Sequence, residues 1–283
     1  MEIKKIMVIG SGQMGNGIAQ VSAQAGYEVI LNDMKEEFAE KGLANIIKNL
    51  SRDVDKGRKS EEEKQTILDR ITLSTDKQDA KDCQLIIEAA VENFEIKKSI
   101  FKELDGIVGE DVILATNTSS LPITDLAAVV SKPQRFIGMH FMNPVPVMKL
   151  VEIIRGVETS DEVYQVIEDL SREMTKDPVE VNDSYGFVSN RVLMPMINEA
   201  AFTLYESVAT PEAIDQVMEL GMNHPMGPLK LADLIGLDTC LSIMNVLYEG
   251  FNDPKYRPCP LLKKYVAAGR LGKKSGQGFY KYD

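Results

Sequence analysis

The sequence has few cysteines, few histidines and no long apolar run. Cys83, Cys240 and Cys259 are the only cysteines among 283 residues, and they lie far apart. Neither a disulfide framework nor a cysteine-based metal site fits this number and spacing, so we expect reduced thiols and no bound metal. Because no segment offers about 20 consecutive apolar residues, no transmembrane helix is predicted.

Positive charge is also scarce. The chain carries 32 Lys and Arg residues against 43 Asp and Glu residues, a formal net charge of −11. Nucleic acids and anionic membrane surfaces would repel such a chain, which argues against general binding to either, and any bound phosphate would need local donors. The apolar stretch at the N-terminus is too short for a secretory signal and runs directly into glycines. We therefore expect a cytoplasmic protein.

Short segments rich in Val, Ile and Leu alternate with helix-favouring segments through the first two-thirds of the chain. Such runs are typical of strands buried on both faces. The alternation predicts an α/β fold of the Rossmann type, a doubly wound and mostly parallel sheet with helices on both faces. The expected strands are residues 5–9, 28–32, 84–88, 112–115, 136–139, 151–154 and 179–181, and expected helices include 14–25 and 95–108.

Two regions depart from this alternation. Residues 36–70 are charged and helix-favouring with Gly57 near the middle, which predicts a projecting pair of helices. Beyond residue 183 the segments are helix-like and punctuated by prolines, and no strand run stands out. We therefore expect a nucleotide-binding domain at residues 1–183 and an all-helical domain at 184–283. The broad apolar faces of the second domain favour a dimer, although a closed monomeric bundle would also bury them.

A glycine-rich segment follows the first predicted strand and precedes a predicted helix: Gly10-Ser11-Gly12-Gln13-Met14-Gly15. It fits the G-x-G-x-x-G pattern of dinucleotide-binding turns. Gly10 permits the tight turn, Gly12 lets the backbone approach a pyrophosphate, and Gly15 lets helix and strand pack closely. The N–H groups at the helix N-terminus would bind the phosphates, and Gln13 and Met14 are expected cofactor contacts.

Asp33 ends the second predicted strand, 18 residues beyond Gly15. A carboxylate there would accept the hydroxyls of the adenine ribose and repel the 2′-phosphate of NADP, so NAD is the expected cofactor. The alternative is that Asp33 is simply a turn residue. Lys35 lies nearby, and the strictness of the preference for NAD is left open.

His140 is one of two histidines and follows the predicted strand 136–139. Ligands of open α/β sheets bind beyond the carboxyl ends of strands. Interconverting an alcohol and a ketone with a nicotinamide needs a proton transfer besides the hydride transfer, and imidazole titrates near neutral pH. Glu152, on the next predicted strand, would orient the ring. The alternative for His140 is a core histidine, and for His224 we expect only a structural role.

A second polar loop, Asn117-Thr118-Ser119-Ser120, follows the predicted strand 112–115. A serine hydroxyl there would donate to a substrate oxygen. The alternative is structural, with Ser120 or Thr124 capping a helix at residues 121–130.

A group of cations has helical spacing: Lys48, Arg52, Lys56 and Lys59. On one helix they would form a basic stripe in an otherwise acidic protein. This stripe would either receive the phosphates of a coenzyme A moiety or be a solvated helix face, and Gly57 would interrupt the helix.

Together these motifs resemble the 3-hydroxyacyl-CoA dehydrogenases over almost the whole chain, most closely the stand-alone 3-hydroxybutyryl-CoA dehydrogenases without a fused hydratase domain. Further segments that carry the resemblance are 88–93 (EAAVEN), 140–152 (HFMNPVPVMKLVE), 186–191 (GFVSNR), 227–229 (GPL) with Asp233, and 276–280 (GQGFY). Met142 stands where the family often has phenylalanine, and it keeps the apolar volume.

The resemblance implies reversible NAD-dependent conversion of (S)-3-hydroxyacyl-CoA to 3-ketoacyl-CoA. His140 would be the acid/base and Glu152 its partner, while Ser119 and Asn190 would bond the reacting oxygen. The helical domain would close over the substrate and form a homodimer or a higher homo-oligomer. Further residues implied to lie near the cofactor or the reaction are Glu92, Lys97, Asn117 and Asn143.

Two other functions compete with this interpretation. One is a related dehydrogenase of a free hydroxy acid or sugar acid. The other is a non-catalytic NAD-binding protein, which we would expect to lack part of the acid/base set that is present here. The sequence leaves open the acyl-chain length, the direction, and whether the acyl-CoA belongs to fatty-acid breakdown or to butyrate metabolism.

Overall fold

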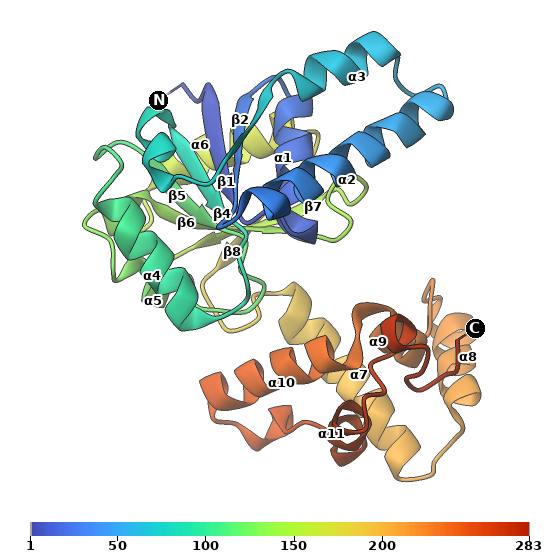
Figure 1. Ribbon diagram of the computed structural model, residues 1–283. Coiled ribbons are helices and arrows are strands. Elements are labelled where there is room, and N and C mark those ends of the chain that lie inside the picture. The colour runs from blue at the N-terminus through green and yellow to red at the C-terminus, as the bar shows by residue number, and fades with distance from the viewer. Residues whose placement is uncertain (1, 283) are drawn as a thin grey trace. The chain divides into compact units, whose positions relative to one another are not determined.

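The computed structural model describes residues 2–282 and divides the chain into two compact units, Met1–Asp183 and Ser184–Asp283 (Figure 1). The first unit contains an 8-stranded sheet in the order β3-β2-β1-β4-β5-β6-β7-β8. Neighbouring strands are parallel except for the antiparallel pair β6–β7, which confirms the predicted mostly parallel sheet. The strands are β1 (Lys5–Ile9), β2 (Glu28–Asn32), β3 (Ile71–Ser74), β4 (Leu85–Glu88), β5 (Ile113–Thr116), β6 (Phe136–Phe141), β7 (Leu150–Arg155) and β8 (Asp177–Asn182).

Helices pack on the sheet because its central strands are apolar on both faces. One shared core joins the sheet to α1, α2 and α6. Helix α4 carries Phe101, whose ring lies edge-on against Phe136 of β6 with the ring centroids 4.6 Å apart. The helices of this unit are α1 (Gln13–Gln24), α2 (Glu36–Asp55), α3 (Glu61–Leu68), α4 (Phe94–Asp105), α5 (Ile123–Ala127) and α6 (Asp161–Glu173).

The pair α2 and α3 projects from the sheet, as predicted (Figure 1). Helix α2 ends at Asp55, Gly57 adopts a φ of +66°, and Ser60 caps α3 through a reciprocal bond with Glu63. The helix is interrupted near Gly57, so the four cations do not form one stripe. Lys48 and Arg52 lie on α2, whereas Lys56 is its C-cap residue and Lys59 lies in the connecting turn.

The second unit consists of helices and short turns, with isolated bridges near its end in place of named strands among the described residues. Its helices are α7 (Ser189–Tyr205), α8 (Pro211–Met222), α9 (Pro228–Ile235), α10 (Leu237–Phe251) and α11 (Pro260–Ala267). Within residues 2–282, no single helix has the length and apolar composition to cross a membrane, and the bent pair α9–α10 meets that criterion only when both helices are counted together. Apolar side chains of this pair lie in the core of the unit.

Two buried carboxylates hold the C-terminal tail onto this unit. Asp233 of α9 accepts the N–H groups of Phe279 and Tyr280 and the hydroxyl of Tyr282. Asp215 of α8 accepts the Tyr280 hydroxyl at 2.7 Å. Burial and the bond to Asp233 raise the pKa of Tyr282, so its hydroxyl remains a donor. The tail is thus fixed by hydrogen bonds to carboxylates in addition to apolar contact.

Candidate active site

The glycine-rich loop between β1 and α1 has the geometry of a dinucleotide-binding turn. Gly10 adopts a φ of +93°, and a Cβ there would lie 2.6 Å from the Ala89 carbonyl oxygen. A Cβ on Gly15 would lie 1.6 Å from the carbonyl oxygen of Gly10. A Cβ on Gly12 would meet nothing within 4 Å. Gly10 and Gly15 therefore permit close packing, whereas Gly12 faces open space where a ligand backbone can approach.

A cavity of about 1150 Å³ opens beside this loop and is bounded by residues of the first unit alone. Val91, Ile96 and Ile100 add an apolar wall to its polar glycine-rich end. A polar turn at a helix N-terminus, with an apolar wall nearby, suits the phosphates and rings of a dinucleotide. The cavity brings together six of the predicted cofactor contacts: Gly10, Gly12, Gln13, Met14, Asp33 and Asn143.

Asp33 is fixed at the edge of this cavity. Its Oδ2 accepts the backbone N–H of Ser11 at 2.7 Å and the Ser11 hydroxyl at 2.6 Å. Its Oδ1 accepts the N–H of Met34 at 2.8 Å, which is a turn contact. Asp33 thus has both features considered from the sequence, a turn bond and a carboxylate beside the glycine-rich loop.

Helix α2 contributes a polar face to the same cavity. Only part of this face was predicted from the sequence. Lys48 and Arg52 line it, whereas Lys56 and Lys59 are not among its lining residues. The spacing along α2 places one helix face toward the cavity. The α2 residues on this face are Lys41, Asn45, Lys48, Asn49 and Arg52.

His140 and Glu152 face each other across the antiparallel pair β6–β7, where they are direct register partners. The His140 Nδ1 atom lies 2.8 Å from Glu152 Oε2. The two residues are only 7% and 2% exposed. Side chains directly opposite in such a pair lie on one face of the sheet, so the backbone itself brings them together.

The loop that joins β6 to β7 is tied to two other elements. The Gln13 amide donates to Asn143 Oδ1 at 3.0 Å, which links the loop to the start of α1. The buried Lys176 ammonium donates to the carbonyl oxygens of Val145 and Met148. Burial lowers the pKa of Lys176. This role of Lys176 could not be predicted from the sequence, because its partners are backbone atoms.

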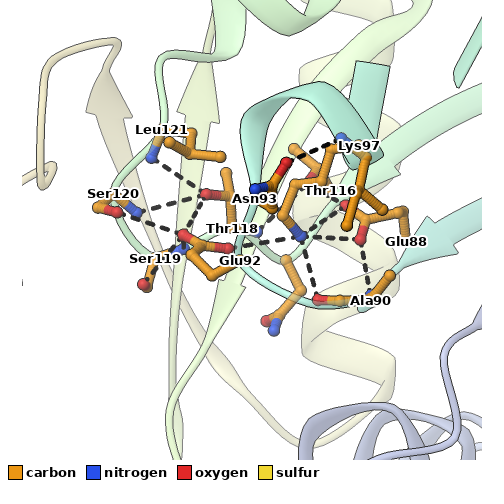
Figure 2. Close-up of polar contacts among 12 residues, drawn as sticks. Glu88, Ala90, Glu92, Asn93, Lys97, Thr116, Thr118, Ser119, Ser120 and Leu121 are labelled. Carbon is orange, nitrogen blue, oxygen red and sulfur yellow. Dashed lines mark hydrogen bonds and ion pairs between the residues drawn. The ribbon is translucent and has the colours of Figure 1, made fainter. Parts of the chain in front are cut away.

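Glu92 and Ser119 meet in a polar network at the ends of β4 and β5 (Figure 2). Glu92 Oε1 accepts the Thr118 hydroxyl at 2.6 Å, the Ser119 N–H at 2.8 Å and the Ser119 hydroxyl at 3.2 Å. Burial acts to raise the pKa of Glu92, but the nearby Lys97 charge and these hydrogen bonds bring the pKa below its ordinary value. Glu92 is therefore a stable anion beside the candidate substrate donor Ser119.

Lys97 lies behind Glu92 and is almost entirely buried. Its ammonium contacts both oxygens of Glu88, at 2.8 and 2.9 Å, and Glu92 Oε2 at 3.4 Å (Figure 2). Glu88 had no predicted role. The available signal was an acidic residue that ends the apolar strand Leu85–Glu88, where a buried charge requires a partner.

Asn117 lies at the end of β5, before helix α5. Asn117 is not among the residues that line the cavity, and its Oδ1 accepts the N–H of Phe141, which fixes the end of β5 to β6. The expected capping of a helix by Ser120 or Thr124 is wrong. Helix α5 begins at Ile123, and the Asp183 carboxylate accepts the first N–H groups instead.

Asn190 lies in the second unit, at the start of α7. His224 also belongs to the second unit, in the turn after α8. Within residues 2–282, no group of three or more His, Cys, Asp or Glu side chains is arranged to hold a metal ion. The three cysteines are buried and unpaired.

The parallel sheet, the glycine-rich turn and the cavity define a dinucleotide-binding protein of the Rossmann class. Two sequence profiles match the chain: the NAD binding domain of 3-hydroxyacyl-CoA dehydrogenase over residues 5–184, and the C-terminal domain of 3-hydroxyacyl-CoA dehydrogenase over residues 186–282. The chain therefore belongs to the 3-hydroxyacyl-CoA dehydrogenase family. This confirms the resemblance and NAD as the cofactor.

Individual relatives extend over the full chain. A probable 3-hydroxybutyryl-CoA dehydrogenase of Bacillus subtilis is 60% identical over 283 residues, which cover 100% of this chain and 99% of the relative. Human mitochondrial hydroxyacyl-coenzyme A dehydrogenase is 42% identical, with 99% and 91% covered. The crystal structure of (S)-3-hydroxybutyryl-CoA dehydrogenase from Ralstonia eutropha matches with a TM-score of 0.97 at 52% identity, and each chain is covered completely.

Proposed function

We propose that this protein catalyses the reversible, NAD-dependent interconversion of (S)-3-hydroxyacyl-CoA and 3-ketoacyl-CoA, with a short acyl chain such as that of acetoacetyl-CoA. The His140–Glu152 pair is the observation that carries the proposal. A buried imidazole held by a carboxylate is the group needed to move a proton when a ketone becomes an alcohol. The short chain is supported by relatives that are 51–60% identical and are described as 3-hydroxybutyryl-CoA dehydrogenases or probable 3-hydroxybutyryl-CoA dehydrogenases.

The proposed mechanism assigns one role to each polar group. When bound, NADH supplies the hydride that C3 of the ketoacyl group accepts. The Glu152 carboxylate accepts a hydrogen bond from the Nδ1–H of His140 and stabilises the imidazolium, whose Nε2 proton is given to the substrate oxygen. Ser119 donates a hydrogen bond to this oxygen as its negative charge develops, and Asn190 is the further donor proposed from the family resemblance. In oxidation His140 removes the proton.

We assign the remaining predicted residues to the two ligands. Gly10, Gly12, Gln13, Met14 and Asp33 hold NAD, with Gly15 supporting the turn. We also propose that Glu92, Lys97, Asn117 and Asn143 lie near the nicotinamide end of the cofactor; of these four, Asn143 lines the cavity.

The coenzyme A phosphates are proposed to contact cations in and after α2. Lys56 and Lys59 are the contacts proposed from the sequence, and Lys48 and Arg52 extend the same group along the helix. Replacing Lys56 and Lys59 with Met should raise KM for acetoacetyl-CoA and leave KM for NADH unchanged. An equal rise in both values would argue against this assignment.

We further propose a cytoplasmic homodimer, formed through the helical unit. Exposed apolar residues on α8 support the dimer: Val217, Leu220 and Met222 are 61%, 79% and 63% exposed. Exposed apolar patches of this kind mark protein interfaces. A monomer by light scattering at micromolar concentration would contradict the dimer.

The decisive experiment compares substrates and a His140 variant. Acetoacetyl-CoA should be reduced with NADH, and free acetoacetate should not. His140→Ala should lose about 10² to 10⁴-fold of kcat while keeping NADH affinity, because only the proton-transfer group is removed. His224→Ala is the matched control and should keep full turnover. Unchanged turnover in His140→Ala, or equal rates with free acetoacetate, would contradict the proposed function.

A further inference from the structure

The buried network at the ends of β4 and β5 contains two carboxylates and one ammonium. Glu88 is fully buried and Lys97 is 1% exposed, whereas the Glu92 side chain is 36% exposed. Glu88 contacts the ammonium through both oxygens, and Glu92 lies farther away, at 3.4 Å. The ammonium charge is therefore compensated mainly by Glu88. Glu92 is held less closely by the ammonium, and its Oε1 accepts hydrogen bonds from the loop that carries Ser119.

Glu88 is held in place independently of Glu92. Its Oε1 accepts the Ala90 N–H at 2.6 Å, and its Oε2 accepts the Thr116 hydroxyl at 2.7 Å. These bonds fix the carboxylate between the end of β4 and the end of β5 (Figure 2). Glu88 therefore has a rigid position from which to hold the Lys97 ammonium.

The contacts of Glu92 Oε1 determine the orientation of the Ser119 hydroxyl. Four donor groups surround this oxygen: the Thr118 hydroxyl, the N–H and hydroxyl of Ser119, and the Ser120 hydroxyl. A carboxylate oxygen has about two lone pairs, so four donors exceed its capacity. The Ser119 hydroxyl, at 3.2 Å, lies beyond the ordinary O–H···O distance. Its hydrogen bond can pass to a substrate oxygen while Thr118 and the Ser119 N–H still hold Glu92.

We propose that Glu88 is a positioning residue for the proposed reaction: by holding the Lys97 ammonium, it leaves Glu92 to orient the loop that carries Ser119. The inference rests on the proposed role of Ser119 as a donor to the reacting oxygen. A buried ammonium needs a carboxylate partner. When Glu88 loses its charge, Glu92 becomes the remaining carboxylate beside Lys97, moves toward it and ceases to orient Ser119.

The test is a double-mutant cycle of Glu88→Gln and Ser119→Ala, read as kcat for acetoacetyl-CoA reduction. Glu88→Gln alone should lower kcat by about tenfold, because the loop donors lose their orientation. In the Ser119→Ala background the same change should lower kcat by less than about twofold, because the hydroxyl on which Glu88 acts is already absent. A purely structural role would give equal losses in both backgrounds.

Two further variants test whether the charge of Glu88 or the packing around it determines kcat. Thr116→Val removes a hydroxyl bonded to Glu88 but keeps every charge, and it should retain kcat within about threefold. If Glu88→Gln does not fold, Glu88→Asp takes its place, because the shorter side chain draws the charge away from Lys97.

The outcomes are distinct. Equal losses in both backgrounds, or wild-type kcat in the Glu88 variant, would overturn the positioning role while leaving the proposed function intact. Wild-type kcat in Ser119→Ala would instead overturn the proposed role of Ser119, and the inference about Glu88 with it.

Discussion

His140 and Glu152 are register partners in the antiparallel pair β6–β7, with Nδ1 of the imidazole 2.8 Å from Oε2 of the carboxylate. The strand backbones set this distance, since directly opposed residues project from the same face of a sheet. Both side chains are buried, which limits competition from water for their hydrogen bond. The pair is thus built into the sheet and does not require a loop to order when substrate binds.

Glu152→Gln should show how much of kcat depends on the negative charge beside the His140 ring. The amide keeps the volume but loses the anion that stabilises a protonated imidazole, so we expect kcat to fall at least about tenfold. NADH affinity should stay unchanged, because Glu152 is not among the residues that line the cofactor cavity. Stopped-flow reduction of acetoacetyl-CoA and fluorescence titration with NADH measure the two effects. If Glu152→Gln lowered only the affinity for NADH and left kcat unchanged, Glu152 would not be the catalytic partner of His140.

Asp33 should determine the choice between NADH and NADPH. Its carboxylate is fixed by Ser11 beside the glycine-rich loop, where a 2′-phosphate would meet a like charge. Asp33→Asn should raise the NADPH-to-NADH ratio of kcat/KM by about tenfold, equivalent to about 1.4 kcal/mol. Glu37→Gln removes the same charge from an exposed site outside the cavity and should leave the ratio unchanged. An unchanged ratio in Asp33→Asn would show that the carboxylate does not govern specificity.

The first unit illustrates which features a sequence can reveal. The ends of β1 and β2 match the prediction because each is an apolar run followed directly by a glycine or an aspartate. Strand β3 was missed, since Ile71–Ser74 is a short edge strand whose residues are only partly buried. The local pattern there lacks the buried run that identifies the central strands.

Contacts between distant segments could not be predicted in the same way. The capping of α5 by Asp183 joins residues about 60 positions apart, and the sequence near α5 offered Ser120 and Thr124 as plausible local caps. The hydrogen bonds from Lys176 to backbone carbonyls could not be predicted either, because every residue type has a carbonyl oxygen. Such contacts depend on tertiary placement, which residue types alone do not specify.

The carboxylate of Asp233 should be essential to the stability of the second unit. Asp233→Asn places an amide donor against the donors of the C-terminal tail, and we expect the free energy of unfolding to fall by about 2–4 kcal/mol. Tyr282→Phe removes a single hydroxyl and should lower it by about 1 kcal/mol. The exposed Glu249→Gln variant should stay within about 0.5 kcal/mol. Urea unfolding followed by tyrosine fluorescence tests this order, and equal values for the three variants would contradict it.

Lys176 should make stability rise with pH in the alkaline range. Burial lowers its pKa in the folded protein, whereas lysine in an unfolded chain titrates near about 10.4. Between these two values the unfolded chain binds more protons than the folded one, so the contribution of Lys176 to the free energy of unfolding increases with pH. Below the folded pKa both states carry the charge, and this contribution is constant.

Lys176→Met should remove that alkaline increase, because methionine does not titrate. The difference in unfolding free energy between wild type and Lys176→Met should therefore grow in favour of wild type as the pH rises toward about 10.4, with a limiting slope of about 1.4 kcal/mol per pH unit. Lys149→Met, which removes an exposed charge from the β6–β7 loop, is the control and should not reproduce this growing difference. Urea titrations across this range measure the differences. Parallel curves for wild type and Lys176→Met would show that the buried ammonium beneath the β6–β7 loop has an ordinary pKa.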